Sequence, residues 1–106
     1  MELIKKGNTE ELSIHLTRNG QEIDIDDVAV AHFTIDTLEK EYPSENVSYD
    51  SETFCFIIKL SQQETLDIKT KKEIKWEAGI RYTDGETKRT HTNKIPVEET
   101  LFKEVI

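Results

Sequence analysis

The chain has one cysteine and three histidines, the residue types that most often supply a nucleophile, a general base or a metal ligand. Cys55 stands between two phenylalanines in an alternating run, which predicts a buried and inert thiol. His15, His32 and His91 are widely separated, without the close His or Cys pairs that zinc sites usually show. We therefore expect neither a cysteine nucleophile nor a metal site.

Three aspartates, Asp24, Asp26 and Asp27, resemble the start of a calcium-binding loop. Such a loop also needs a glycine at its sixth position and a bidentate glutamate at its twelfth. Counted from Asp24, those positions hold Ala29 and Ile35. The pattern predicts a solvated acidic turn, whose three carboxylates are candidate contacts for a protein partner.

Lysines gather at one place in the sequence, at Lys69, Lys71, Lys72 and Lys75. An acidic partner or another anion could dock there, so the first three lysines are candidate partner-binding residues. The alternative interpretation is that these charges follow an edge strand and discourage edge-to-edge aggregation.

No phosphate-binding or cofactor-binding motif accompanies these groups. The four glycines, at positions 7, 20, 79 and 85, are scattered rather than gathered in a phosphate-binding loop. Carboxylates are abundant, and no pair stands apart as an acid and base couple. The sequence thus predicts a protein that is not an enzyme and uses no cofactor.

The 22 acidic and 14 basic residues give a formal net charge of -8. This charge repels phosphate backbones and anionic lipid heads, so neither nucleic acid nor a membrane is an expected partner. Lys40 is the only base between residues 19 and 58, whereas residues 59–94 carry more bases than acids. The imbalance indicates either two solvated faces of differing sign or an electrostatic contact for head-to-tail stacking with a copy or a neighbour.

The compartment signals favour the cytoplasm. A single cysteine cannot form an internal disulfide, and the first residues lack the apolar stretch of a signal peptide. No segment approaches the length of a membrane span. We expect synthesis in the cytoplasm.

Alternating apolar and polar residues, the pattern of a strand with one buried face, recur along the chain. Residues 53–60 show it most clearly and are expected mid-sheet. The inward rows are predicted to include Phe33, Phe54, Phe56 and Trp76, which should carry much of the stability. Further strands are expected at residues 2–6, 12–17, 21–25, 28–35 with Ala29 on the same face as Phe33, 73–82, 86–92, and from 95 onward with Leu101, Phe102 and Val105.

Turn signals separate these strands. Asn19-Gly20 and Asp84-Gly85 each favour a hairpin, because these residues tolerate positive φ. Ser61 with Glu64 three positions later is the pattern of a capping box, which predicts one short helical turn near residues 61–68. The polar, acidic segment 36–51 is expected to be a long exposed loop or a ragged edge strand.

Length and strand spacing together indicate an architecture. A chain of 106 residues fits one domain, residues 1–106, without room for two cores. Seven or eight short strands at regular spacing predict an all-β fold, in the form of an immunoglobulin-like antiparallel β-sandwich.

Several stretches resemble the small immunoglobulin-like domain at the N-terminus of phage baseplate upper proteins. The matching stretches are Lys6-Gly7-Asn8-Thr9, Ile23-Asp24-Ile25 after the Asn-Gly turn, His32-Phe33-Thr34-Ile35, Phe56-Ile57-Ile58-Lys59-Leu60, Glu64-Thr65-Leu66, Trp76-Glu77-Ala78-Gly79-Ile80-Arg81-Tyr82 and Thr83-Asp84-Gly85. The resemblance covers nearly the whole chain and implies a structural module of phage or prophage origin. It supplies no catalytic residues. In that family the domain anchors a larger receptor-binding organelle or serves as a small structural module, and because the sequence here stops at Ile106 we expect either a standalone accessory protein or an excised domain.

Three functions follow as hypotheses. The first is a structural, protein-binding module that contacts phage tail or baseplate subunits or a copy of itself, and that is virion-associated after synthesis. The second is an acidic regulator or inhibitor of a basic protein. The third is a small-ligand or carbohydrate binder with Tyr42, Tyr49 and Tyr82 as aromatic platforms.

Overall fold

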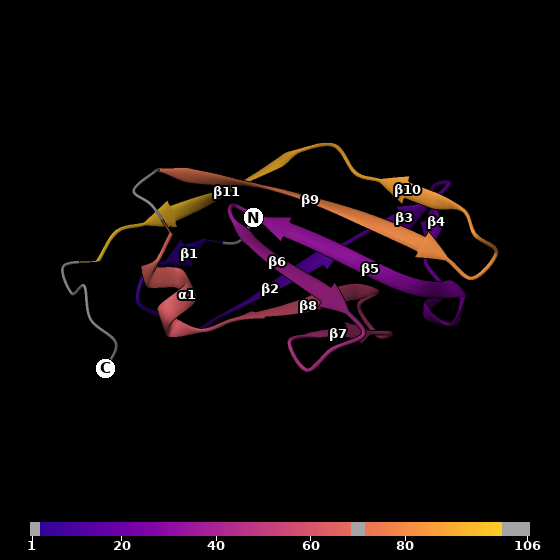
Figure 1. The fold of residues 1–106 in the computed structure, drawn as a ribbon, viewed down its shortest axis with the longest axis horizontal. Coiled ribbons are helices and arrows are strands. Elements are labelled where there is room, and N and C mark those ends of the chain that lie inside the picture. Colours follow the sequence, from indigo (N-terminus) through magenta and orange to yellow (C-terminus); the bar gives the residue numbers. More distant parts are fainter. Residues whose placement is uncertain (1–2, 69–71, 101–106) are drawn as a thin grey trace.

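Strands dominate the fold of this chain (Figure 1). The computed structural model describes residues 3–68 and 72–100. Of these residues 57% lie in strands and 8% in helical turns, which makes the fold all-β, as predicted.

The strands form two sheets and one small hairpin. The larger sheet has the order β1-β11-β9-β5-β6, with β10 also pairing β9, and the smaller has the order β2-β8-β7. Within the larger sheet the strands are β1 (Ile4–Lys5), β5 (Val28–Ile35), β6 (Leu38–Tyr42), β9 (Glu73–Tyr82), β10 (Thr87–Arg89) and β11 (Asn93–Glu98). The other strands are β2 (Glu10–His15), β7 (Val47–Asp50) and β8 (Cys55–Leu60) in the smaller sheet, and β3 (Thr17–Arg18) with β4 (Gln21–Glu22) in the hairpin. All paired strands are antiparallel except β1 and β11, which run parallel.

The inner faces of the two sheets meet around a single aromatic centre. Phe33 of β5 packs on Phe56 of β8, with ring centroids 5.3 Å apart. Tyr42 and Tyr49 approach Phe56 edge-on at 5.6 and 4.9 Å. Both phenylalanines are fully buried. Edge-to-face contacts between rings add to the stabilisation from burial, so this cluster joins strands from both sheets.

The predicted turns are confirmed. Asn19 and Gly20 have φ angles of 53° and 80° between β3 and β4. Gly85 has φ 90° in the turn that joins β9 to β10. Helix α1 (Gln62–Leu66) begins with the expected capping box, because the Ser61 hydroxyl accepts from the backbone N–H of Glu64 and the Glu64 carboxylate accepts from that of Ser61. The 3₁₀ turn η1 (Ile25–Asp27) precedes β5.

The segment 36–51 is not a long loop, and the edge-strand alternative is the correct one. It forms two strands, β6 at the edge of the larger sheet and β7 at the edge of the smaller. Lys40 and Val47 point inward and are buried, although acidic residues surround them in the sequence. Glu39 and Glu41 are exposed on either side of Lys40. Because the inward residue between them is a lysine, the segment shows no clear alternation of apolar and polar residues.

Two predicted core positions are wrong for backbone reasons. Phe54 is exposed, because it lies outside β8 with a φ of 57°. Ala29 is exposed and Val28 is buried, because the register of β5 against β9 shifts between Val28 and Val30. A bulge moves a residue to the opposite face. Trp76 is only partly buried, packed against the core.

The strand count also differs from the seven or eight expected. Eleven strands are described, because two-residue segments such as β1, β3 and β4 form ladders of their own. Strand β8, which covers most of the predicted strand 53–60, lies between β2 and β7 and is thus mid-sheet, as predicted. The predicted extension of the last strand through Leu101, Phe102 and Val105 lies outside the described residues.

Candidate functional site

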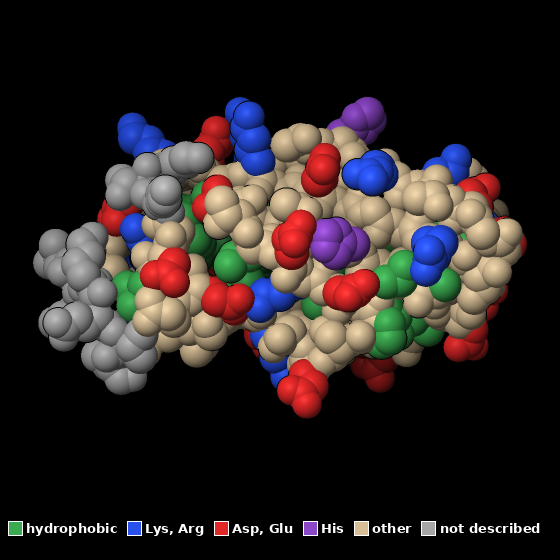
Figure 2. All heavy atoms as spheres, viewed as in Figure 1, with side chains coloured by type: hydrophobic (Ala, Val, Ile, Leu, Met, Phe, Trp, Pro, Cys, Tyr) green, Lys and Arg blue, Asp and Glu red, His purple; other side chains and the backbone are tan. Residues whose placement is uncertain are grey.

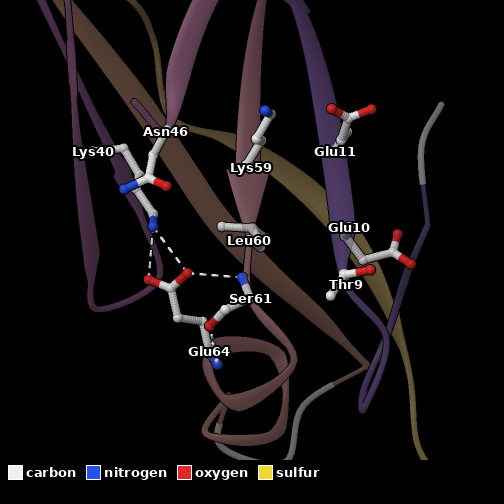
Figure 3. A pocket seen from close by; sticks show the side chains of 9 residues that line it. All are labelled: Thr9, Glu10, Glu11, Lys40, Asn46, Lys59, Leu60, Ser61 and Glu64. Carbon is white, nitrogen blue, oxygen red and sulfur yellow. Dashed lines mark hydrogen bonds and ion pairs between the residues drawn. The ribbon is translucent and has the colours of Figure 1, made fainter. Parts of the chain in front are cut away.

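A depression of about 720 Å³ opens where the smaller sheet meets helix α1 (Figure 3). We call it the Lys40 groove. Its lining residues come from the start of β2, the end of β8, edge strand β6 and the N-terminus of α1: Thr9, Glu10, Glu11, Lys40, Asn46, Lys59, Leu60, Ser61 and Glu64. On the β7 side of β8, the Lys59 N–H donates to the carbonyl of Asn46 at 2.8 Å. Asn46 is the residue before β7 begins at Val47.

An ion pair between Lys40 and Glu64 closes the inner end of the groove. The Lys40 ammonium donates to both carboxylate oxygens of Glu64, at 2.9 and 2.7 Å. One of those oxygens also accepts from the Ser61 backbone N–H at 2.8 Å, as Figure 3 shows. The lysine side chain is 8% exposed and that of Glu64 28%. Helix capping and the link between β6 and α1 therefore share one carboxylate.

This arrangement holds Glu64 in its charged form. Partial burial alone would raise the pKa of the carboxyl. Hydrogen bonds from Lys40 and from Ser61, with the charge of Lys40, outweigh that effect and lower the pKa below its ordinary value. The pair is thus a structural contact at neutral pH, and both of its charges are already compensated.

The rim of the Lys40 groove is polar and has both signs of charge. Glu11 and Lys59 are cross-strand neighbours on β2 and β8, and both are exposed. In Figure 3 their side chains lie apart from the Lys40–Glu64 pair, toward the open side. Among the described residues, every buried side-chain nitrogen and oxygen has a hydrogen-bond partner. Such a rim suits hydrogen bonding to a polar segment of another protein.

Sequence reasoning identified parts of this groove without joining them. Lys40 was noticed as the only base in an acidic stretch, and Glu64 as a capping residue. Their 24-residue separation hid the pair. In the alternation of an edge strand, Lys40 falls on the inward face. Because a buried lysine needs a partner, this position could have pointed to a buried ion pair.

The predicted acidic residues form an exposed turn at one end of the molecule. The carboxylate of Asp24 caps η1 by accepting from the backbone N–H of Asp26 at 3.0 Å. The Asp27 carbonyl accepts from the N–H of Thr83 at 2.8 Å, which ties this turn to the β9–β10 hairpin. All three aspartate side chains face solvent.

The predicted lysine cluster is only partly described. Lys72 is exposed before β9, and Lys69 and Lys71 lie outside the described residues. In Figure 1, β9 begins at the left end of the molecule, whereas β5, which follows the acidic turn, begins at the right end. The longest dimension is 47 Å. Lys72 and the acidic turn therefore cannot form one site within a single molecule.

Cys55 is half-buried, which corrects the prediction of a buried thiol. It starts β8, and its outward side chain donates a weak hydrogen bond to the Thr53 carbonyl at 3.4 Å. His15 of β2 stands opposite in the ladder, a neighbour that sequence reasoning missed. The His15 Nε2 lies 2.9 Å from both carboxylate oxygens of Glu22. These groups lie on the outer face of the smaller sheet.

The three tyrosines proposed as platforms are engaged by other side chains. Tyr42 and Tyr49 pack on Phe56, and the Tyr49 hydroxyl donates to the Ile23 carbonyl at 3.1 Å. Burial raises the pKa of Tyr49. Tyr82 is 3% exposed beneath the Arg18 guanidinium, whose carbon lies 3.7 Å from the ring centroid. Tyr82 is therefore covered, whereas Tyr42 and Tyr49 remain partly exposed.

Arg18 completes a second polar cluster at the β9–β10 turn. Its guanidinium donates to Asp84 at 3.1 Å and to Glu86 at 3.3 Å. The backbone N–H of Glu86 donates to Asp84, and with the Arg18 contact it lowers the pKa of that carboxyl. The cluster fastens the β3–β4 hairpin to the larger sheet.

Comparisons with known proteins leave the family open. No protein-family model matches the chain, and no curated protein matches it.

Within residues 3–68 and 72–100, no group of three His, Cys, Asp or Glu side chains is placed to hold a metal ion. The same residues contain no helix long and apolar enough to cross a membrane.

Proposed function

We propose that this chain is an immunoglobulin-like sandwich that binds other proteins and catalyses no reaction, as a structural module of a phage or prophage tail or baseplate. The observation that carries the proposal is the strand order. Immunoglobulin-like domains place strands G, F and C, with C′ in the variable type, in one sheet and B, E and D in the other. The orders β11-β9-β5-β6 and β2-β8-β7 support this assignment, with β1 and β10 as additional strands of the larger sheet.

The chain departs from antibody domains in its centre. Its single cysteine rules out the disulfide between strands B and F, and Phe33 stands on β5, the strand that would hold the buried tryptophan. The Phe33–Phe56 contact links the sheets at this level instead. Sandwiches with this architecture share no single function, so the role must come from surfaces.

The Lys40 groove is the surface that we assign to partner binding. There β6 is an edge strand of the larger sheet, with no second neighbouring strand among the described residues. Unpaired N–H and C=O groups on an edge can accept an extended segment of a partner. The rim charges of Glu11 and Lys59 would select its side chains. The phage setting derives from the sequence resemblance alone.

A capture experiment tests this proposal. Tagged chain is incubated with lysate from phage-infected or prophage-induced cells, and captured proteins are identified by mass spectrometry. We expect the parent chain to capture tail or baseplate subunits. Lys59→Glu should reduce this capture. Lys75→Glu, the same charge change at an exposed residue of β9, should leave it unchanged. Failure to capture any virion protein, or equal capture by both variants, would contradict the proposal.

The acidic regulator is a second candidate, favoured by one observation. The bond from Thr83 to Asp27 brings the acidic turn beside the turn that contains Asp84. Carboxylates from two separate segments thus gather at one end, where they could imitate an anionic surface. Salt-sensitive binding of a basic protein, lost in Asp24→Asn/Asp26→Asn/Asp27→Asn, would support it; binding unchanged by that triple variant would exclude it.

A further inference from the structure

One row of residues crosses the outer face of the larger sheet with opposite charges at its two ends. The ladders pair Glu41 of β6 with His32 of β5, His32 with Gly79 of β9, and Gly79 with Arg89 of β10. Glu41, His32 and Arg89 are exposed. The residues on either side of His32 in β5 are buried, whereas all of β10 is exposed. Within the described part of the chain, neither Glu41 nor Arg89 forms an ion pair.

Gly79 makes a hollow in the middle of this face. The hollow has a volume of about 230 Å³, and its lining includes His32, Arg81 and Arg89. A Cβ atom added at Gly79 would lie 3.8 Å from the Arg89 side chain and 3.9 Å from the Lys88 carbonyl oxygen, so it would fit in ordinary contact with both. Figure 2 shows this face with a histidine near its centre, acidic side chains beside it and basic ones above and to its right.

The row is complementary to itself. Neighbouring strands are about 4.8 Å apart, so the Glu41 and Arg89 backbones, three strands apart, are about 14 Å apart and cannot pair within one molecule. A two-fold axis that runs parallel to the strands, in the plane of contact above the space between β5 and β9, reverses the row. It places Glu41 opposite Arg89 of a second copy, and His32 opposite the hollow at Gly79.

The adjacent rows are compatible with this axis. Glu77 of β9 is paired with Thr34 of β5, and Arg81 is paired with Val30. The two-fold operation places Glu77 opposite Thr34 of the second copy and Arg81 opposite Val30, so these pairs bring no like charges together. Isologous contacts require this kind of self-complementarity, because each patch meets its own image.

We infer that two copies of the chain associate through this face, with His32 of each copy in the Gly79 hollow of the other and two Glu41–Arg89 ion pairs between them. The contact is polar and lacks large apolar side chains, so it is weak and sensitive to salt. It goes beyond the proposed function, because it uses the outer face of the larger sheet and leaves the Lys40 groove free.

Sedimentation velocity of the purified full chain, from micromolar to millimolar concentration, tests the inference. We expect a concentration-dependent dimer that salt weakens. Glu41→Arg and Arg89→Glu should each weaken it at least about tenfold, because each puts like charges together twice. The double variant Glu41→Arg/Arg89→Glu should restore it. Such rescue is specific to contact between copies, since the two positions cannot touch within one.

Two further variants complete the test. Gly79→Val fills the hollow without changing charge and should also yield monomer, whereas Glu52→Arg, at an exposed residue between β7 and β8, should dimerise normally. A monomer at every concentration, a double variant that stays monomeric, or a dimer that tolerates Gly79→Val would each overturn the inference. So would a chain that remains monomeric and uses Arg89 only to bind an added acidic protein.

Discussion

The two faces of the larger sheet are built from the same strands and have opposite chemistry. On the inner face, Phe33 and Ala78 are paired neighbours and almost fully buried. One residue further along each strand, Thr34 and Gly79 lie on the outer face, which has charged neighbours and an open hollow. Period-two alternation therefore gives single strands a packed inner face and a solvent-facing outer face.

The inner and outer faces of the larger sheet differ in how well they tolerate changes in sequence. Inner positions are bounded by atoms on all sides, so a change in volume costs stability. Outer positions are bounded by solvent, so a change there alters charge and shape while the fold persists. Binding can be tuned on the outside without redesign of the core.

The largest expected effect is on the inner face, at Phe33. Phe33→Ala removes the ring that packs on Phe56 and should cost about 3–5 kcal/mol of unfolding free energy. Thr34→Ala, on the next residue and the outer face, should change it by less than about 0.5 kcal/mol. Urea denaturation of both variants measures the contrast. Similar losses in the two would show that the faces are not separated as described.

A smaller effect is expected at Lys40, the charge on the inner face of β6. Lys40→Ala removes two hydrogen bonds to the half-buried Glu64 and should cost about 1–3 kcal/mol. Glu39→Ala, the adjacent outward residue, serves as the control and should be nearly neutral. A Lys40→Ala chain as stable as its parent would mean that the pair contributes nothing to the fold.

The same pair predicts a pH dependence. Because the pKa of Glu64 lies below its ordinary value of 4.5 in the folded chain, its contribution to stability is complete above that pH. The contribution is lost as the pH falls through the folded-state value. Between neutral pH and acid, Glu64→Gln should therefore lose less stability than the parent chain. Parallel pH profiles for the two would contradict the assignment.

Local signals made much of the fold predictable. The alternation in β8 and β9, the two hairpin turns and the Ser61 capping box each lie within a few residues, and each is present. Phe54 failed because its positive φ breaks the alternation just before β8, which no pattern of residue types signals. The prediction that Ala29 points inward was wrong because a bulge between Val28 and Val30 reverses the alternation, and no glycine in the sequence marks that bulge.

The candidate sites were less predictable, because they depend on pairing between distant segments. Lys40 and Glu64 meet because the fold brings the Lys40 side chain of β6 to the N-terminal turn of α1. The order of Glu41, Gly79 and Arg89 across one face depends on three ladders. Composition and periodicity give the face of each residue, and strand order decides its neighbours.

Neighbouring residues of β9 provide the most direct test of the separation between faces. Ala78 is 3% exposed and points inward, whereas a Cβ at Gly79 would lie on the outer face in ordinary contact with Arg89 at 3.8 Å and the Lys88 carbonyl oxygen at 3.9 Å. At micromolar concentration, we expect Ala78→Val to lose about 1–3 kcal/mol of unfolding free energy through overpacking. Gly79→Val should retain the parent stability or gain up to about 1 kcal/mol from strand propensity. A loss at Gly79 as large as that at Ala78 would contradict the account.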